Sequence, residues 1–291
     1  MCEHTYWKEK KVDITFEKFC KILDKMPGLA SVDLTGIGEG LLNKDFLKIL
    51  EEGKRRNLRM RFNTNGTLFN PEIAKKIVDL EVDEIHFSVD GGTKETFESI
   101  RKGAKFEKVL ESVDFIQQAK KNLHQKPELH FICIAMKETV HEIPKLVDIA
   151  ASKHVKYVDI QGMIEFEQNQ EHGSHSLKIS DVAESFAEAK KKADKLRVHL
   201  VLPGLTEKKT TCLHPWFQTY VLSDGTVLPC CLYGQQNNRE ELRNELSFGN
   251  ILEDDFDDIW NNQKYQDIRG MLASDKLSGI CAKCPIPKGK F

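Results

Sequence analysis

Helical and strand patterns alternate along the chain as far as about residue 202, and this alternation restricts the fold more than any other feature. Apolar residues recur at helical intervals at Phe106, Val109, Leu110 and Val113, and similar runs begin at Phe16, Ile143 and Val182. Short strand candidates lie between such helices, at 30–35, 59–64, 84–90, 128–136, 155–161 and 197–202. Repeated strand–helix units give parallel strands with crossover helices, so the sequence predicts an α/β barrel or an open doubly wound sheet.

Several strand candidates alternate apolar and polar residues, although a parallel strand covered on both faces should be apolar throughout. The polar positions are Asp33, Arg61, His86, Asp90, Asp159 and Gln161. One face then packs on helices and the other turns polar groups inward. A closed barrel fills its interior with Val, Ile and Leu, so this pattern favours a lumen that holds a ligand. A sheet with one solvated face is the alternative, and a hydrogen-bonded structural histidine is the simpler interpretation of His86.

Five of the eight cysteines lie in the last third of the chain: Cys212, Cys230, Cys231, Cys281 and Cys284. Clustered thiols indicate metal or iron–sulfur ligation where stable disulfides are rare. Four thiolates complete a tetrahedral zinc site or hold an iron–sulfur cluster, and the spacing alone leaves both open. Adjacent side chains of an extended segment point opposite ways, so we expect only one of Cys230 and Cys231 to reach the metal.

The sequence changes character near residue 205, which predicts two domains, 1–205 and 206–291. In the second, Asp224-Gly225 lies between two apolar runs and predicts a β-hairpin. Short helices are predicted around 254–261 and 264–273. A module this small needs a staple such as a metal.

Charge and hydropathy argue against several classes of partner. The formal net charge is −2, which gives no case for nucleic acid. The longest apolar run, 131–136, has six residues and is too short to span a bilayer. The first residues lack the apolar region of a secretory signal. We therefore expect a cytoplasmic protein that binds neither nucleic acid nor membrane.

Four loop motifs occur in order along the first domain: Gly36-Ile37-Gly38-Glu39-Gly40, Asn63-Thr64-Asn65-Gly66-Thr67, Ser88-Val89-Asp90-Gly91 and Ile100-Arg101-Lys102-Gly103. Together they resemble the motifs of radical S-adenosylmethionine (SAM) enzymes. The tail, from Cys212 through Pro229-Cys230-Cys231 to Cys281 and Cys284, is similar to the SPASM/twitch auxiliary-cluster domain of that superfamily. The resemblance covers nearly the whole chain. It implies a partial (β/α)6 TIM-like barrel lacking its first strand, followed by a cysteine-rich β-hairpin/helix twitch domain.

The resemblance also implies roles for individual residues of the first domain. Glu39 matches the acidic residue that grips the SAM amino group, and Gly40 replaces the proline that usually follows it. Ser88 matches a hydroxyl that commonly meets the ribose. Arg101 is a candidate for the SAM carboxylate.

Two iron–sulfur clusters are implied as well. Cys212, Cys230, Cys281 and Cys284 match the ligands of a single auxiliary 4Fe–4S cluster, which leaves Cys231 as a spare thiol. In the family, a C-x3-C-x2-C motif holds the SAM-binding 4Fe–4S cluster. Cys2 matches its third cysteine, and the first two would precede Met1. We therefore interpret the sequence as truncated inside this motif, and we expect the chain as printed to be inactive in the radical step.

The implied function is reductive cleavage of SAM, hydrogen abstraction from a polar small-molecule or peptide substrate, and one-electron oxidation through the auxiliary cluster. The implied partner is an electron donor such as flavodoxin or ferredoxin. One alternative is a relative without the SAM-binding cluster that acts as an iron–sulfur electron-relay or binding protein. Another is a zinc-stapled α/β protein that binds a nucleotide-like ligand.

Overall fold

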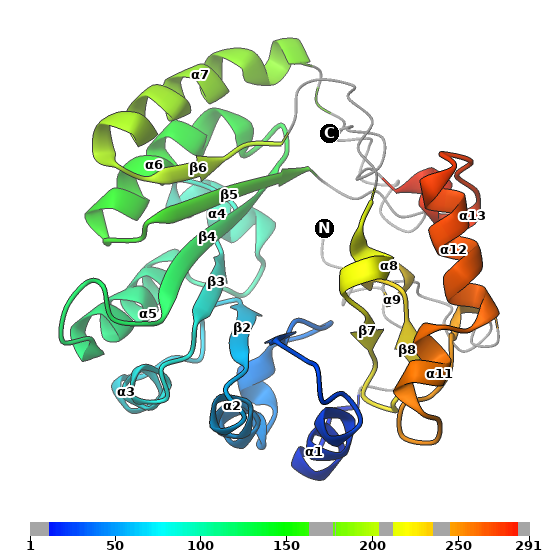
Figure 1. Cartoon of the computed structure of the whole chain (residues 1–291). Coiled ribbons are helices and arrows are strands. Elements are labelled where there is room, and N and C mark those ends of the chain that lie inside the picture. The colour runs from blue at the N-terminus through cyan, green and yellow to red at the C-terminus, as the bar shows by residue number, and fades with distance from the viewer. Residues whose placement is uncertain (1–11, 163–176, 178, 204–211, 235–244, 285–291) are drawn as a thin grey trace. The chain divides into compact units, whose positions relative to one another are not determined.

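The computed structural model describes residues 12–162, 177, 179–203, 212–234 and 245–284 (Figure 1). Contacts divide the chain into two compact units. The sheet unit comprises 30–205, and the cysteine unit comprises 2–29 together with 206–290. The N-terminal helix therefore packs with the C-terminal module, a grouping that the sequence patterns did not indicate.

Six parallel strands form one sheet in the order in which they occur in the chain. Neighbouring strands that follow chain order are typical of a barrel wall, whereas a doubly wound sheet reverses its order at a switch point. The α/β prediction is confirmed, and the strand order selects the barrel. The strands are β1 (Ser31–Asp33), β2 (Arg59–Thr64), β3 (Glu84–Ser88), β4 (Glu128–Ala135), β5 (Tyr157–Gly162) and β6 (His199–Val201).

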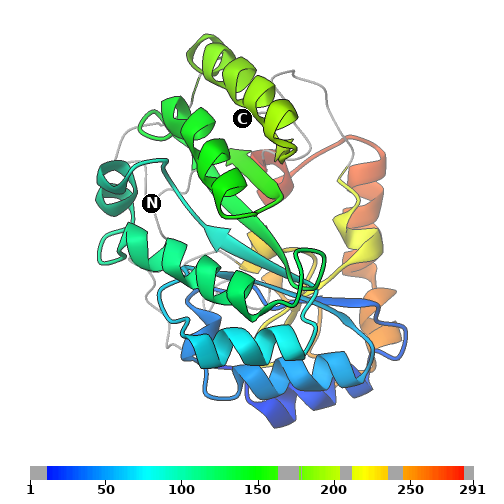
Figure 2. The same cartoon turned by 90° about the vertical axis from the view of Figure 1, so that its left-hand side faces the viewer.

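Helices between these strands form a layer over one side of the sheet, which faces the viewer in Figure 2. The strand residues Met60, Phe62, Ile85, Phe87 and Phe131 are buried in the core of this unit. The helical elements are η2 (Gly40–Leu42), α2 (Phe46–Arg55), α3 (Pro71–Asp79), α4 (Lys94–Ile100), α5 (Phe106–Ala119), η3 (Val140–Glu142), α6 (Ile143–Ser152) and α7 (Ile179–Leu196).

Local sequence signals start two of these helices. The side chain of Asn70 accepts a hydrogen bond from the Ile73 amide at 2.8 Å, and Pro71 occupies the first turn of α3, where a missing N–H costs nothing. Thr93 caps α4 through the Thr96 amide at 3.2 Å. These caps fix where α3 and α4 begin. They therefore set the far ends of the loops that follow β2 and β3.

The cysteine unit is built from short elements around its own apolar core. Asp224 and Gly225 form the predicted hairpin turn, since the Asp224 carboxylate accepts a hydrogen bond from the Thr226 amide at 3.0 Å. The buried residues of the core are Ile22, Val227, Phe248, Ile251, Ile259, Tyr265, Ile268, Leu272 and Cys281. The elements are α1 (Phe16–Asp24), α8 (His214–Phe217), β7 (Tyr220–Val221), β8 (Val227–Leu228), α9 (Cys231–Gly234), α11 (Phe256–Trp260), α12 (Gln263–Ala273) and α13 (Gly279–Lys283).

The N-terminal helix is tied to the C-terminal module by polar contacts as well as by its buried face. Lys18 Nζ donates to the Ser223 carbonyl at 3.3 Å, and Lys25 Nζ donates to the Asp254 carbonyl at 2.7 Å. Ile22 contributes its side chain to the core between them. Residues separated by more than 200 positions thus complete one packed unit.

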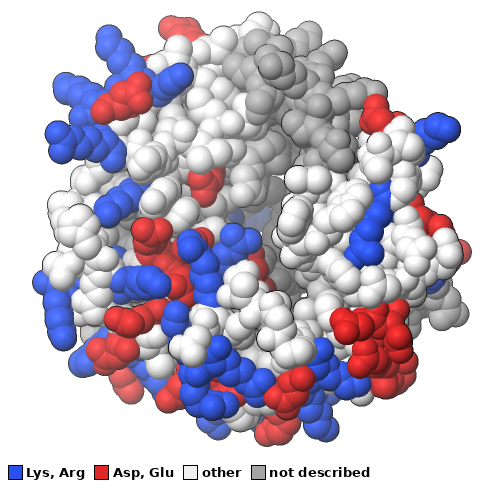
Figure 3. Space-filling view, viewed as in Figure 1, with Lys and Arg blue, Asp and Glu red and all other residues white. Residues whose placement is uncertain are grey.

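Surface charge is mixed over the sheet unit on the face seen in Figure 3, where Lys and Arg alternate with Asp and Glu. In the cysteine unit, acidic residues gather around α11, at Glu253, Asp254, Asp255, Asp257 and Asp258. Among the described residues, no helix combines the length and the apolar character needed to cross a bilayer.

Candidate functional site

Five cysteines from three separate segments line one pocket in the cysteine unit, and four of them match the implied ligands of an auxiliary cluster. Cys212 precedes α8, Cys230 follows the hairpin, and Cys281 and Cys284 lie on α13 and directly after it. The pocket is partly enclosed and has a cavity volume of about 30 Å³. Its other lining residues are His214, Pro215, Cys231, Leu232, Tyr233, Ile268, Leu272 and Ile280. The structure therefore brings together the four cysteines that the sequence singled out.

The thiols in this pocket are poorly solvated. Burial raises the pKa of Cys230 to about 12, and the neighbouring sulfurs of Cys231 and Cys281 add to the shift. Burial likewise raises the pKa of Cys281 to about 11. A thiol with so high a pKa is a weak nucleophile at neutral pH. A bound cation would supply the charge that stabilises the thiolates. Four sulfur donors around one pocket suit an iron–sulfur cluster or a zinc ion better than they suit a reactive thiol.

Arg269 on α12 positions the segment that carries Cys212. Its Nε donates to the Pro215 carbonyl at 2.9 Å, and its Nη1 donates to the Trp260 carbonyl at 2.8 Å. The guanidinium also lies over the rings of Trp260 and Tyr265, at 4.5 and 4.8 Å from their centroids. Sequence analysis did not identify this residue, because nothing in its local pattern distinguishes it from a surface arginine.

Two further residues border the thiols. The Tyr233 hydroxyl hydrogen-bonds to the Cys281 sulfur, and burial raises the pKa of Tyr233. Cys231 also lines the pocket, but its side chain is exposed, whereas Cys230 beside it is partly buried. The adjacent cysteines thus differ in their environment.

In the sheet unit, the loops that follow β1 and β2 meet at Glu39. One carboxylate oxygen of Glu39 accepts from the Thr64 hydroxyl at 2.8 Å, and the other accepts from the Asn65 amide at 2.7 Å. Asn65 is held in turn by Thr67, whose amide and hydroxyl both donate to its side-chain oxygen. These bonds fix the orientation of the Glu39 carboxylate at the carboxyl ends of the strands, which is where barrel enzymes place ligands.

Ser88, Asp90 and Arg101 lie on or after β3, and the structure separates their roles. Ser88 is partly buried on the polar face of the strand. Asp90 is fully buried: it accepts from Arg101 Nε and from the Ile134 amide, each at 2.7 Å. The sequence pattern placed Asp90 in the lumen, whereas the structure uses it to hold Arg101 and strand β4. Arg101 therefore reaches any ligand only with the part of its guanidinium that Asp90 does not engage.

Glu142 fixes the loop between Asp90 and α4. Its carboxylate accepts four hydrogen bonds, from the amides of Gly92 and Thr93 and from the hydroxyls of Thr93 and Thr96, at 2.7 to 3.0 Å. Burial opposes the charge, but these donors lower the pKa of Glu142 below its usual value. The loop after β3 is thereby bound to η3. Glu142 lies 50 residues from Gly92, so no local motif could have identified this contact.

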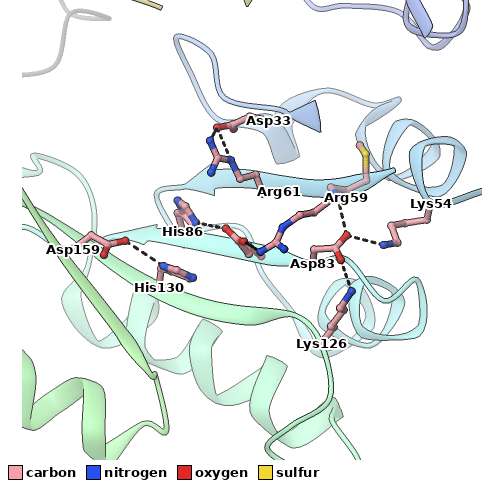
Figure 4. Close-up of polar contacts among 11 residues, drawn as sticks. Asp33, Lys54, Arg59, Arg61, Asp83, His86, Lys126, His130 and Asp159 are labelled. Carbon is pink, nitrogen blue, oxygen red and sulfur yellow. Dashed lines mark hydrogen bonds and ion pairs between the residues drawn. The ribbon is translucent and has the colours of Figure 1, made fainter. Parts of the chain in front are cut away.

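A row of polar side chains crosses the sheet at the amino-terminal half of β3 and β4 (Figure 4). Here Glu84, His86 and His130 place one ligand atom each within 4.8 Å of one another. Sequence analysis selected His86 and missed the other two residues, since their proximity depends on strand register. Cys2, the predicted ligand of the SAM-binding cluster, lies outside the described residues.

Comparison with protein families identifies the family of the chain. The sequence profile of the Radical SAM superfamily matches residues 3–150, and the profile of SPASM, an iron-sulfur cluster-binding domain, matches residues 212–285. The chain belongs to the radical SAM superfamily. It also carries a C-terminal SPASM domain, and the pocket with the four cysteines lies within that matched region. Domains of these two kinds bind SAM and iron–sulfur clusters.

Relatives of the chain match it over most of its length. It is 26% identical to a tungsten-containing aldehyde ferredoxin oxidoreductase cofactor-modifying protein of Pyrococcus furiosus, over 98% of this chain and 83% of the relative. It is 25% identical to the AdoMet-dependent heme synthase of Methanosarcina barkeri, over 86% of this chain and 73% of the relative.

Several solved structures share the fold of this chain. The structure of anSMEcpe with bound AdoMet matches with a TM-score of 0.68 at 18% identity, covering 99% of this chain and 84% of that one. Streptococcus suis SuiB bound to its precursor peptide SuiA matches with a TM-score of 0.70 at 13% identity, covering 92% of this chain. The chain spans 63% of the length of SuiB. At these identities the likeness establishes the fold alone.

Proposed function

We propose that this protein is a radical SAM oxidoreductase or maturase. In the proposed reaction, a polar small-molecule or peptide substrate gives up a hydrogen atom, and the substrate radical then loses one electron and one proton. Cys212, Cys230, Cys281 and Cys284 would hold an auxiliary 4Fe–4S cluster, which would supply an acceptor for this electron. The product is a dehydrogenated or cross-linked substrate.

When bound, SAM and its own 4Fe–4S cluster supply the radical chemistry: one electron splits SAM into methionine and a 5′-deoxyadenosyl radical, which leaves as 5′-deoxyadenosine after taking the hydrogen atom. The residues of the chain bind and orient the reactants. We assign Glu39 to the SAM ammonium, because a carboxylate held by Thr64 and Asn65 is a fixed acceptor for a cation. Ser88 is assigned to the ribose, and Arg101 to the SAM carboxylate through the part of its guanidinium outside the Asp90 pair.

The observation that carries the proposal is the convergence of four cysteines on one pocket inside the SPASM match. With four protein ligands, a cluster keeps no iron site for substrate, so electron transfer suits it better than substrate binding. Peptide substrates receive support from relatives of the same fold, since SuiB was solved with a precursor peptide and anSMEcpe with AdoMet and the Cp18Cys peptide. An electron donor such as flavodoxin or ferredoxin completes the proposed cycle.

Anaerobic reconstitution with iron and sulfide tests the auxiliary cluster. We expect the Cys230→Ser variant to lose the absorbance, iron and sulfide of this cluster, whereas the matched Cys231→Ser variant retains them. Equal loss in both variants, or equal retention, would overturn the assignment. Zinc without sulfide in the purified protein would favour the zinc-stapled alternative.

Release of 5′-deoxyadenosine from SAM under a strong reductant tests the radical step. The expectation that the chain as printed does not perform this step stays a prediction, and the same assay decides it. A protein with an intact auxiliary cluster that yields no 5′-deoxyadenosine would support the electron-relay alternative. The Glu39→Gln variant should weaken SAM binding without changing the iron content of the auxiliary cluster.

A further inference from the structure

Four ring-bearing side chains stand in register across the polar face of the sheet. His86 on β3 is directly opposite His130 on β4, His130 is opposite Tyr157 on β5, and Tyr157 is opposite His199 on β6. Ring centroids lie 4.4, 4.3 and 5.1 Å apart along this row. Parallel register thus fixes the ring planes of the two histidines (Figure 4).

Glu84 completes a three-residue group at one end of this row. It precedes His86 by two positions on β3, so both side chains leave the same face of the strand. Glu84 Oε2 lies 3.0 Å from His86 Nε2, and the ligand atoms of Glu84, His86 and His130 all lie within 4.8 Å of one another. The side chains are 10%, 14% and 13% exposed. The group is therefore compact and largely shielded from solvent.

His130 is oriented as a metal-binding histidine usually is. Its Nδ1 lies 3.1 Å from Asp159 Oδ2, and an N–H that donates to this carboxylate leaves Nε2 as the nitrogen with a lone pair. This Nε2 is buried and has no hydrogen-bond partner among the described residues. A histidine that ligates a metal typically donates its other N–H to a carboxylate in the same way.

The charges around the group accommodate a cation. Arg59 pairs with Oε1 of Glu84, which leaves Oε2 toward His86. Arg61 is engaged by Asp33 at 2.8 Å. The carboxylates of Glu84, Asp159 and Asp33 outnumber the two guanidiniums.

We propose that Glu84, His86 and His130 form a binding site for one divalent transition-metal cation of the Zn²⁺ type. Two imidazole nitrogens and one carboxylate oxygen suit Zn²⁺ or Fe²⁺, whereas Mg²⁺ and Ca²⁺ prefer oxygen ligands alone. Three protein ligands leave at least one coordination position for water or for a substrate group. Ser88 lies on the same face of β3, two residues beyond His86. At the usual rise per residue, the two positions are about 7 Å apart along the strand. A cation here would thus lie on the polar face next to the proposed SAM site, while depending on none of its residues.

Zinc K-edge X-ray absorption of untagged protein tests this site. The protein is first loaded with iron and sulfide, so that its cysteines are occupied, and is then dialysed against Zn²⁺. We expect about one zinc per chain with nitrogen and oxygen neighbours at about 2.0–2.1 Å, distinct from sulfur neighbours at about 2.3 Å. No bound zinc, or zinc with a sulfur shell alone, would overturn the proposal.

Variants assign the nitrogen and oxygen shell to these residues. His86→Gln and His130→Gln should each weaken zinc binding at least tenfold, and Asp159→Asn should weaken it by about 10–100-fold through the lost orientation of His130. His199→Gln is the matched control, because it removes an imidazole from the same row but from none of the three ligands, and it should bind as the wild type does. If a histidine variant fails to fold, Glu84→Gln provides the same comparison. Unchanged zinc affinity in a folded ligand variant would contradict the site.

Discussion

The two units of this protein place functional side chains by different means. In the sheet unit, strand period and register bring side chains together. His86 and His130, for example, are neighbours because β3 and β4 pair in parallel. In the cysteine unit, the strands β7 and β8 have two residues each, and α8, α9, α11 and α13 have four or five. Elements so short cannot persist on their own hydrogen bonds. Strand register therefore brings the two histidines together in the sheet unit, whereas the placement of the cysteines in the other unit depends on its core and on whatever they bind.

Removal of the proposed auxiliary cluster should produce the largest difference in stability between the two units. Structural zinc sites contribute on the order of 10 kcal/mol to the folding of small metal-binding domains, and we expect a cluster held by four cysteines to act similarly. After chelation, hydrogen exchange should lose protection across 212–234 and 245–284, while β3 and β4 keep theirs. Loss of protection in both units at once would show that the sheet unit also depends on the cluster.

Shortening a buried side chain of α1 should lower the stability of the cysteine unit, although this helix lies at the opposite end of the sequence. Ile22 is 6% exposed and belongs to the core of that unit. The Ile22→Ala variant should lose about 2–5 kcal/mol of unfolding free energy. Urea unfolding followed by hydrogen exchange should show the loss in 212–234 and 245–284 rather than in the sheet. Lys21→Ala, an exposed position on the same helix, should change stability by less than about 0.5 kcal/mol.

Acid should act on the sheet unit through Glu52. Its carboxylate accepts from Arg55 Nε and Nη2 and from Arg56 Nε, each at 2.7 Å. The hydrogen bond from Arg55 is the main cause that lowers the pKa of Glu52 from 4.5 to about 2, and Arg56 adds to it. The unfolded chain takes up this proton first as the pH falls, so the stabilisation is complete above pH 4.5 and disappears toward pH 2.

The Glu52→Gln variant measures this contribution. Relative to wild type it should lose about 1–2 kcal/mol at pH 7, the range for hydrogen bonds between charged groups when one partner, here Arg55, is largely exposed. The difference should vanish near pH 2. Glu51→Gln, an exposed neighbour on α2, is the control and should show no such pH-dependent difference. A difference between Glu52→Gln and wild type that persists at pH 2 would argue against an electrostatic origin.

The smallest expected effect concerns the Tyr233 hydroxyl, and this prediction rests on the proposed cluster. Hydrogen bonds to cluster sulfurs raise the reduction potential. Tyr233→Phe should therefore lower the midpoint potential of the auxiliary cluster by about 40 mV, which corresponds to about 1 kcal/mol for one electron. Tyr265→Phe removes a hydroxyl that contacts Thr219 at 2.7 Å instead, and its potential should stay close to that of wild type. Redox titration by electron paramagnetic resonance measures both.

The sequence was most informative where local pattern determines structure. The predicted strand at 59–64 coincides with β2, and the helical spacing from Phe106 to Val113 lies within α5. The strand predicted at 84–90 ends at Ser88, because Asp90 turns away to bind Arg101 and the Ile134 amide. Such a contact depends on residues far along the chain, and periodicity cannot reveal it.

The candidate site shows the same limit. The cysteines could be selected from their residue type and spacing, and the structure lines one pocket with them. Arg269, Glu142 and His130 could not be selected, since each acts through a partner that only the tertiary fold supplies. The apolar face of α1 was visible in the sequence, but an amphipathic pattern does not say which surface will cover it.

The bond between Lys25 and the Asp254 carbonyl, which spans 229 residues, has a consequence for synthesis. A ribosome that adds about 5–20 residues per second needs roughly 10–45 s to make the chain between these two residues. Throughout that interval the newborn α1 exists without its binding surface, while the strands of the sheet unit emerge and can pair. Although α1 is synthesised before the sheet unit, it is therefore among the last elements to reach its native contacts, and its side chains Phe19, Ile22 and Leu23 offer chaperones an early binding segment.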